Sequence, residues 1–161
     1  MSIVNSLLKV FLGDKSGKDL KKLTPLVDEI NKHFIGLSSL SNDELRDKTH
    51  NFKKIISNKT TELVSSLKKL NESITNESSN IEKEKLFSEV EIVEKDLSET
   101  KSQILDEILP EAFAVVKETA RRFYENESLK VSASEFDKEI GSKKPYVTID
   151  GDSATWKNSW D

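Results

Sequence analysis

A segment near the start of the chain has the residue types of a phosphate-binding loop. It runs Gly13-Asp-Lys-Ser-Gly-Lys-Asp19. Such a loop needs the form G-x-x-x-x-G-K followed by Ser or Thr, because backbone N–H groups surround the phosphates and the hydroxyl binds magnesium. Here the spacing is one residue short, Asp19 stands where the hydroxyl is needed, and no buried strand precedes the segment. We therefore interpret it as the end of one helix and the start of another.

The two histidines are the other residues that could support metal binding or acid–base catalysis. Neither His33 nor His50 has a second histidine or a carboxylate at the spacing of a metal-ligand set. The chain contains no cysteine, which excludes disulfides and thiolate sites. It also has no nucleophile elbow, zinc-protease motif or calcium loop. The sequence therefore predicts no catalytic, cofactor-binding or metal-binding residue.

The composition predicts long helices with a large solvated surface. Apolar residues make up 35% of the 161 residues and charged residues 34%, whereas an ordinary globular domain has roughly 45–50% and about 25%. The formal net charge of -4 provides no overall basic surface for nucleic acid, so nucleic acid is not an expected partner. No apolar run approaches the length of about eighteen residues that a membrane-spanning helix needs.

The first twelve residues predict a short amphipathic helix that ends near Gly13. Its apolar residues recur at three- and four-residue steps, and lysines are frequent up to Lys22. A basic amphipathic helix can lie on an anionic bilayer, while a terminal helix packed on a protein core is the alternative that these residues leave open. The candidate membrane-contact residues are Ile3, Val4, Leu7, Leu8, Lys9, Phe11 and Leu12.

The spacing of apolar residues predicts a second helix over residues 18–34 and then a long helical hairpin. Pro25 would lie in or near the first turns of the second helix, and Ser41 with Glu44 has the form of a capping box that starts the third. Two stripes then alternate mostly in four- and three-residue steps, as in a coiled-coil seam. They predict an antiparallel hairpin over residues 51–104, projecting roughly 30–40 Å. The stripes are Leu45, Phe52, Ile56, Thr60, Leu63, Leu67, Leu70 and Ile74, and Leu86, Val90, Val93, Leu97, Thr100, Ile104 and Ile108.

The segment LPEAFAVVKETARRF, residues 109–123, is far more apolar than its surroundings. Pro110 is expected to begin a helix there, since its fixed φ suits a first turn. One apolar row contains Phe113 and Val116, and the neighbouring row contains Val115. Together the two rows form an apolar surface that is wider than a two-helix seam requires. We therefore expect this helix to contact more than one neighbour, including a lobe outside the chain.

The last part of the chain, from Glu125 to Asp161, changes character. Residues 146–149 resemble a strand, and Asp150-Gly151 resembles the tight turn of a hairpin. An isolated hairpin is marginally stable. We therefore expect this tail to be loosely held.

Two segments together closely resemble the amino-terminal region of the SecA family, the ATPase motor of bacterial protein export. They are LSNDELRDKT at 40–49 and PEAFAVVKETARR at 110–122. The resemblance covers about residues 1–56 and 104–123. The usual family pattern joins these parts by a short link, so the hairpin between them is expected to be an insertion.

The resemblance implies an activity that the chain does not contain by itself. In this family a RecA-like domain binds ATP and Mg²⁺ through motifs that follow the second matching segment, and no such motif precedes Asp161. The expected partners are the SecYEG channel, preproteins and acidic phospholipids, and a homodimer is left open. The expected location is the cytoplasm and the cytoplasmic face of the inner membrane.

The predicted fold is mainly α, with a short irregular or β lead-in to the RecA-like domain. Two functions remain open: the amino-terminal part of an ATP-driven translocase, inactive alone, or a self-contained helical adaptor that binds a partner through its coiled-coil arm. The predicted division is amino-terminal helices at 1–56, an inserted hairpin at 57–103, a packing helix at 104–123 and an inserted lead-in at 124–161.

Overall fold

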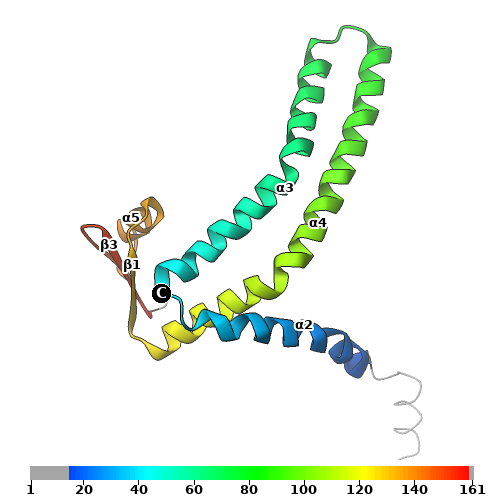
Figure 1. The fold of residues 1–161 in the computed structure, drawn as a ribbon. Helices are drawn as coiled ribbons and strands as arrows, with labels where there is room; N and C mark the ends of the chain where they lie inside the picture. Colours follow the sequence, from blue (N-terminus) through cyan, green and yellow to red (C-terminus); the bar gives the residue numbers. More distant parts are fainter. Residues whose placement is uncertain (1–14, 160–161) are drawn as a thin grey trace, which may run out of the picture.

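The computed structural model describes residues 15–159, which form a helical base, a long two-helix arm and a small sheet (Figure 1). This arrangement confirms the mainly α fold with an antiparallel helical hairpin. The candidate membrane-contact residues Ile3, Val4, Leu7, Leu8, Lys9, Phe11 and Leu12 lie outside the described residues. The elements are α2 (Lys15–Leu37), α3 (Asn42–Asn76), α4 (Asn80–Glu125), β1 (Ser128–Ser132), α5 (Glu135–Gly141), β2 (Val147–Asp150) and β3 (Ser153–Lys157).

The arm is formed by α3 and the first part of α4, which run side by side in opposite directions (Figure 1). Every residue of the two predicted stripes is buried or half-buried, with Phe52, Thr60 and Ile104 the most enclosed on the arm. The predicted capping box is also confirmed, since the backbone N–H of Glu44 donates to the Ser41 hydroxyl and the N–H of Ser41 donates to the Glu44 carboxylate. Within residues 15–159, no helix combines the length and the apolar character needed to cross a bilayer.

The helix that contains PEAFAVV does not begin at Pro110, so that expectation is wrong. Instead α4 is one continuous helix of 46 residues with Pro110 buried in its interior. Proline removes one backbone donor and its ring crowds the preceding turn, which bends a helix without necessarily ending it. Figure 1 shows α4 changing direction between its green and yellow parts, the stretch that contains Pro110. Pro25 likewise lies inside α2, because this helix already begins at Lys15.

The tail is an ordered three-stranded antiparallel sheet, which corrects the expectation that it is loosely held. The strand order is β1-β3-β2, and Gly151 adopts the positive φ of 55° that the turn between β2 and β3 requires. This hairpin confirms the predicted strand and turn. Its stability comes from elements that the sequence interpretation missed, since β1 pairs with β3 along five residues and α5 packs beside β2.

The apolar core lies where the three long helices meet. Leu37 from the end of α2, Leu45 and Phe52 from α3, and Ala114 and Val115 from α4 form its buried cluster. The sheet has separate buried residues, Val131, Val147 and Ala154, which are not part of this cluster. The base and the sheet therefore have their own apolar interiors.

Candidate docking face and its supporting ionic junctions

The second half of α4 has one covered face and one uncovered apolar face. Ala114 and Val115 are buried against α2 and α3, whereas Phe113 and Val116 are 52% and 66% exposed. The sequence prediction that this helix needs further cover is consistent with the exposed row. We call the uncovered row the α4 outer stripe; its three- and four-residue spacing places it on one side of the helix. It consists of the exposed Leu105, Phe113, Val116, Ala120 and Tyr124, with the half-buried Leu109 in the same row.

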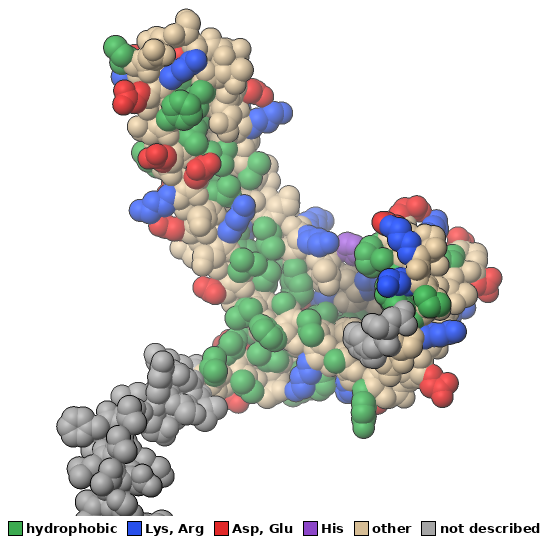
Figure 2. Space-filling model, turned by 180° about the vertical axis from the view of Figure 1, so that it is seen from behind, with side chains coloured by type: hydrophobic (Ala, Val, Ile, Leu, Met, Phe, Trp, Pro, Cys, Tyr) green, Lys and Arg blue, Asp and Glu red, His purple; other side chains and the backbone are tan. Residues whose placement is uncertain are grey.

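Helix α2 extends this apolar surface at the base of the arm. Leu23 and Val27 are exposed, while Ile30 and Phe34 pack partly against the core. Figure 2 shows apolar side chains gathered over the base of the arm, where α2 and α4 meet. Lys117 of α4 contacts two residues of α2. Its Nζ lies 4.2 Å from the centre of the Phe34 ring and donates to Oδ1 of Asn31 at 2.8 Å. The uncovered surface is therefore held on a fixed pair of helices.

A buried ionic junction lies on the covered side of α4, away from the α4 outer stripe. Glu118 is fully buried and accepts hydrogen bonds from Arg121, at 2.7 and 2.9 Å, and from Nε of Arg122 at 2.8 Å. The hydrogen bond from Arg121 outweighs the cost of burial and, together with Arg122, lowers the pKa of Glu118 to about 2. Glu118 is therefore an ionised carboxylate whose charge is neutralised by its own helix.

Arg122 links this junction to α2 and α3 by hydrogen bonds. Its Nη2 donates to the backbone oxygens of Leu37, at 3.0 Å, and Leu40, at 2.7 Å, and its Nη1 donates to Oδ1 of Asn42 at 2.8 Å. The last carbonyls of a helix lack partners within the helix. Arg122 thus satisfies the end of α2 and binds the start of α3 at the same time, which fixes the angle between the base and the arm.

A second ionic junction joins α3 to the sheet. Arg46 donates through both terminal nitrogens to the carboxylate of Asp137, which is fully buried and also accepts from Nε1 of Trp156 at 2.9 Å. Burial opposes ionisation of Asp137, but the hydrogen bonds from Arg46, Ser134 and Trp156 outweigh it and lower the pKa to about 2. The sheet is therefore attached to the arm by a charged contact.

The first turn of α3 also occupies the outer edge of β1. Asn42 donates to the carbonyl of Lys130 at 3.0 Å, Arg46 donates to the carbonyl of Ser132 at 3.1 Å, and Asp43 accepts from the N–H of Ser132 at 2.9 Å. These groups point away from β3 and would otherwise be unpaired. Side chains of a helix thus take the place of a neighbouring strand.

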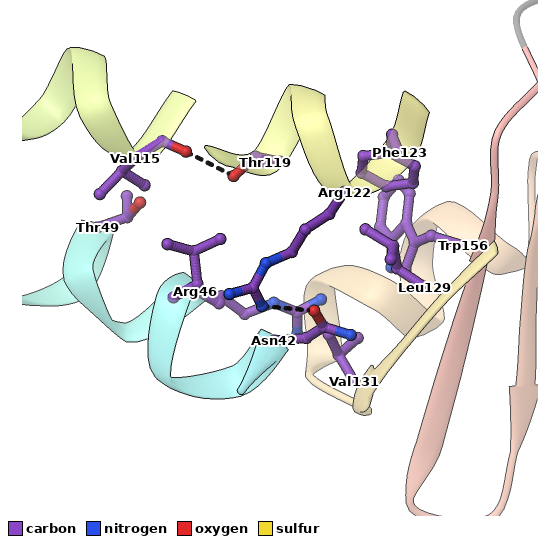
Figure 3. A pocket seen from close by; sticks show the side chains of 11 residues that line it. Asn42, Arg46, Thr49, Val115, Thr119, Arg122, Phe123, Leu129, Val131 and Trp156 are labelled. Carbon is purple, nitrogen blue, oxygen red and sulfur yellow. Dashed lines mark hydrogen bonds between the residues drawn. The ribbon is translucent and has the colours of Figure 1, made fainter. Parts of the chain in front are cut away.

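A cavity of about 270 Å³ lies between this contact and α4. Figure 3 shows residues of α3, α4 and the sheet around it, with Arg122 reaching from α4 to Asn42. Its apolar walls include Val115, Leu129 and Val131. The base and the sheet therefore meet mainly through polar contacts around a hollow.

The structure places the two histidines on the surface of two different helices. His33 and His50 are exposed and belong to different helices, and Nδ1 of His50 lies 3.4 Å from Asp47. No group of three or more metal-ligating side chains occurs within residues 15–159.

The sequence analysis does not identify Glu118 or Asp137, because the composition predicts helices with a large solvated surface on which charged residues are expected. Two local signals were present. Glu118 and Arg122 are four residues apart and continue the row of Val115, and Ser134 with Asp137 has the spacing of a capping box. The partner Arg46 lies 91 residues away from Asp137 and had no such signal.

Comparison with known proteins gives the family. The model of the SecA DEAD-like domain matches residues 8–134. The protein translocase subunit SecA of Christiangramia forsetii is 45% identical over 161 residues, covering 100% of this chain and 14% of the relative. The corresponding subunit of Flavobacterium psychrophilum is 42% identical over 160 residues, and that of Bacteroides fragilis is 37% identical over 156. They cover 99% and 97% of this chain and 14% of each relative.

These matches extend across the helical arm and the sheet, so the relatives share the parts that the resemblance in sequence motifs did not cover. The chain spans about 14% of the length of these relatives. No solved structure matches the chain. Since the family model covers most of the chain, including all of α4 and the junction of Glu118 and Arg122, the chain belongs to the SecA DEAD-like domain family.

Proposed function

We propose that this chain is the amino-terminal part of a SecA-type translocase subunit and that its α4 outer stripe packs against the motor lobe. The single observation that carries this proposal is the exposure of Phe113, Val116 and Tyr124 on the helix that contains the PEAFAVV segment. Soluble proteins rarely leave a continuous apolar patch of this kind uncovered unless it is an interaction site. The lobe that covers it is a RecA-like domain that binds ATP and Mg²⁺.

In this proposal the segment has a structural role, and the chemistry takes place elsewhere in the subunit. Hydrolysis of ATP in the motor lobe drives preproteins through the SecYEG channel. The ionic junctions of Glu118 and Arg122 hold α2, α3 and α4 at fixed angles, so the lobe docks on a rigid surface. Residues 57–103 act as an inserted coiled-coil arm, and residues 124–161 act as an inserted lead-in to the motor lobe.

The proposed membrane contact is the amino-terminal amphipathic helix. Its apolar residues would enter the surface of an acidic bilayer or contact the channel, while nearby lysines interact with anionic headgroups. The candidate contact residues remain Ile3, Val4, Leu7, Leu8, Lys9, Phe11 and Leu12. This places the protein in the cytoplasm and at the cytoplasmic face of the inner membrane, with a homodimer left open.

The docking proposal is tested by comparing the full-length protein with residues 1–161 alone. Val116→Asp is expected to lower ATP turnover and the melting temperature of the full-length protein, because a buried unpaired carboxylate is costly. The same change is expected to leave the melting temperature of residues 1–161 nearly unchanged, since Val116 is exposed there. Ile81→Asp, at an exposed position on the arm, is the matched control.

The outcome distinguishes the two functions left open by the sequence. Residues 1–161 alone are expected to show no ATP turnover above background. A full-length protein that tolerates Val116→Asp as well as Ile81→Asp would show that the motor lobe does not cover the α4 outer stripe. That result would favour the adaptor, in which the coiled-coil arm binds a separate protein.

A further inference from the structure

Phe123 and Trp156 also line a second hollow, at the end of the sheet. This hollow has a volume of about 300 Å³ and is lined by three aromatic residues, Phe123, Tyr146 and Trp156, and by two lysines, Lys144 and Lys157. The aromatic residues come from α4, from the residue before β2 and from β3. It is distinct from the α4 outer stripe and contains none of that stripe's residues. We call it the aromatic hollow.

The walls of the aromatic hollow are held in place by contacts outside it. The indole N–H of Trp156 donates to the buried carboxylate of Asp137, and its ring stacks on Phe136 with the two planes 15° apart. Tyr146 lies beside Trp156 with ring centres 6.3 Å apart, and its carbonyl accepts from the N–H of Lys157. A ligand would therefore meet a preformed site and would not have to order it.

The charge at the rim is positive and uncompensated among the described residues. Lys144 and Lys157 are exposed, and within residues 15–159 neither forms an ion pair. The neighbouring Lys138 and Lys143 differ, since each pairs with a glutamate of α5, at 2.8 and 2.6 Å. Among residues 15–159, no carboxylate lines the hollow. Its two cations are therefore available to an acidic ligand.

We propose that the aromatic hollow binds an acidic segment of a partner protein. One aromatic or large aliphatic side chain of that segment inserts among Phe123, Tyr146 and Trp156, and adjacent carboxylates pair with Lys144 and Lys157. The hollow has a volume of about 300 Å³, at the lower limit of the range of about 300 to 1,000 Å³ for small-molecule pockets, and this space can take one large side chain. Aromatic walls supply the apolar contact and the lysines select the sign of the partner's charge.

The test measures binding of a labelled peptide to the full-length protein by fluorescence anisotropy. The probe is a heptapeptide with a central phenylalanine flanked by glutamates, and the two matched peptides replace either the phenylalanine by alanine or the glutamates by lysine. The first peptide is expected to bind in a salt-sensitive manner, and both replacements are expected to weaken binding about tenfold or more.

Two double variants with the same change in net charge locate the site. Lys144→Glu with Lys157→Glu is expected to weaken binding of the probe about tenfold, because two surface attractions become repulsions. Lys138→Glu with Lys143→Glu is expected to change it less than about twofold, because these lysines lie outside the hollow. All four residues are exposed, so both variants are expected to fold, which circular dichroism checks.

Three results would overturn the proposal. Equal effects of the two double variants would mean that binding follows net charge alone. Failure of the full-length protein to bind the probe would mean that its own chain fills the hollow. Displacement of the probe by AMP, with loss of AMP binding in the Lys144 and Lys157 variant, would reassign the site to a nucleotide. None of these results depends on whether the motor lobe covers the α4 outer stripe.

Discussion

Arg46 and Asp137 form a two-point ion pair across 91 residues of sequence, with Nη1 at 2.8 Å from Oδ2 and Nη2 at 2.9 Å from Oδ1. The carboxylate is fully buried, and the guanidinium comes from the first two turns of α3. Because the sheet contributes no residue to the buried core cluster of the helices, this pair is a principal attachment between the two parts.

Replacement of Arg46 is expected to reduce the stability of the sheet. Arg46→Gln leaves the Asp137 carboxylate buried without its charged partner, and such a change costs about 3 kcal/mol. Hydrogen exchange should therefore accelerate at the amides of β1 and β3, while the amides of the α3 and α4 seam remain protected. Lys138→Gln removes an exposed ion pair with Glu135 and is expected to leave exchange unchanged. Equal protection in both variants would show that the pair does not hold the sheet.

Acidification is expected to weaken the junction at Glu118. The pKa of this carboxyl is lowered to about 2 in the folded chain, first by the hydrogen bond from Arg121, from an ordinary value of 4.5. A lowered folded-state pKa contributes stability that is present above the ordinary pKa and is lost as the pH falls toward the folded-state pKa. The contribution of Glu118 should therefore decline between about pH 4.5 and pH 2.

Urea unfolding at several pH values checks this titration. Wild type should lose more stability over that interval than Glu118→Gln, which cannot titrate at this position. Glu125→Gln is the matched control, because Glu125 also pairs with Arg121 but is exposed. The assignment fails if Glu118→Gln and wild type have parallel dependences on pH.

Substitution of two adjacent valines of α4 by aspartate is expected to change the stability of residues 1–161 by very different amounts. Val115 is 7% exposed and belongs to the core cluster, so Val115→Asp should cost several kcal/mol. Val116 is 66% exposed, so the expected change for Val116→Asp is within about 0.5 kcal/mol. Thermal melting followed by circular dichroism measures both. A large loss in Val116→Asp would mean that the α4 outer stripe is covered within this chain.

Vesicle binding tests the candidate membrane-contact residues among residues 1–12. The chain is expected to bind anionic vesicles weakly and to be released by salt, since lysines near a charged surface are screened within a Debye length. Removal of residues 1–12 should abolish co-sedimentation with anionic vesicles, and neutral vesicles serve as the control. Retained binding after the deletion would assign the contact to another part of the chain.

Local patterns predicted the elements, while contacts between distant residues decided how they are joined. The capping box at Ser41 and the seam spacing from Phe52 onward depend on neighbours three or four residues away, and both occur in the structure. Pro110 was expected to start a helix because that is its common position, but burial beside the core keeps the helix continuous. The strand β1 was missed because its outer edge is completed by side chains of α3, about 88 residues earlier.

The α3 side chains on β1 also bear on how the protein behaves at high concentration. An uncovered strand edge is a template for pairing with other molecules and for fibrillar growth. Since Asn42, Asp43 and Arg46 already bind the C=O of Lys130 and the N–H and C=O of Ser132, an incoming strand would have to displace them to pair at these groups. The contact between α3 and β1 that holds the sheet therefore also protects the outer edge of β1 from pairing with another molecule.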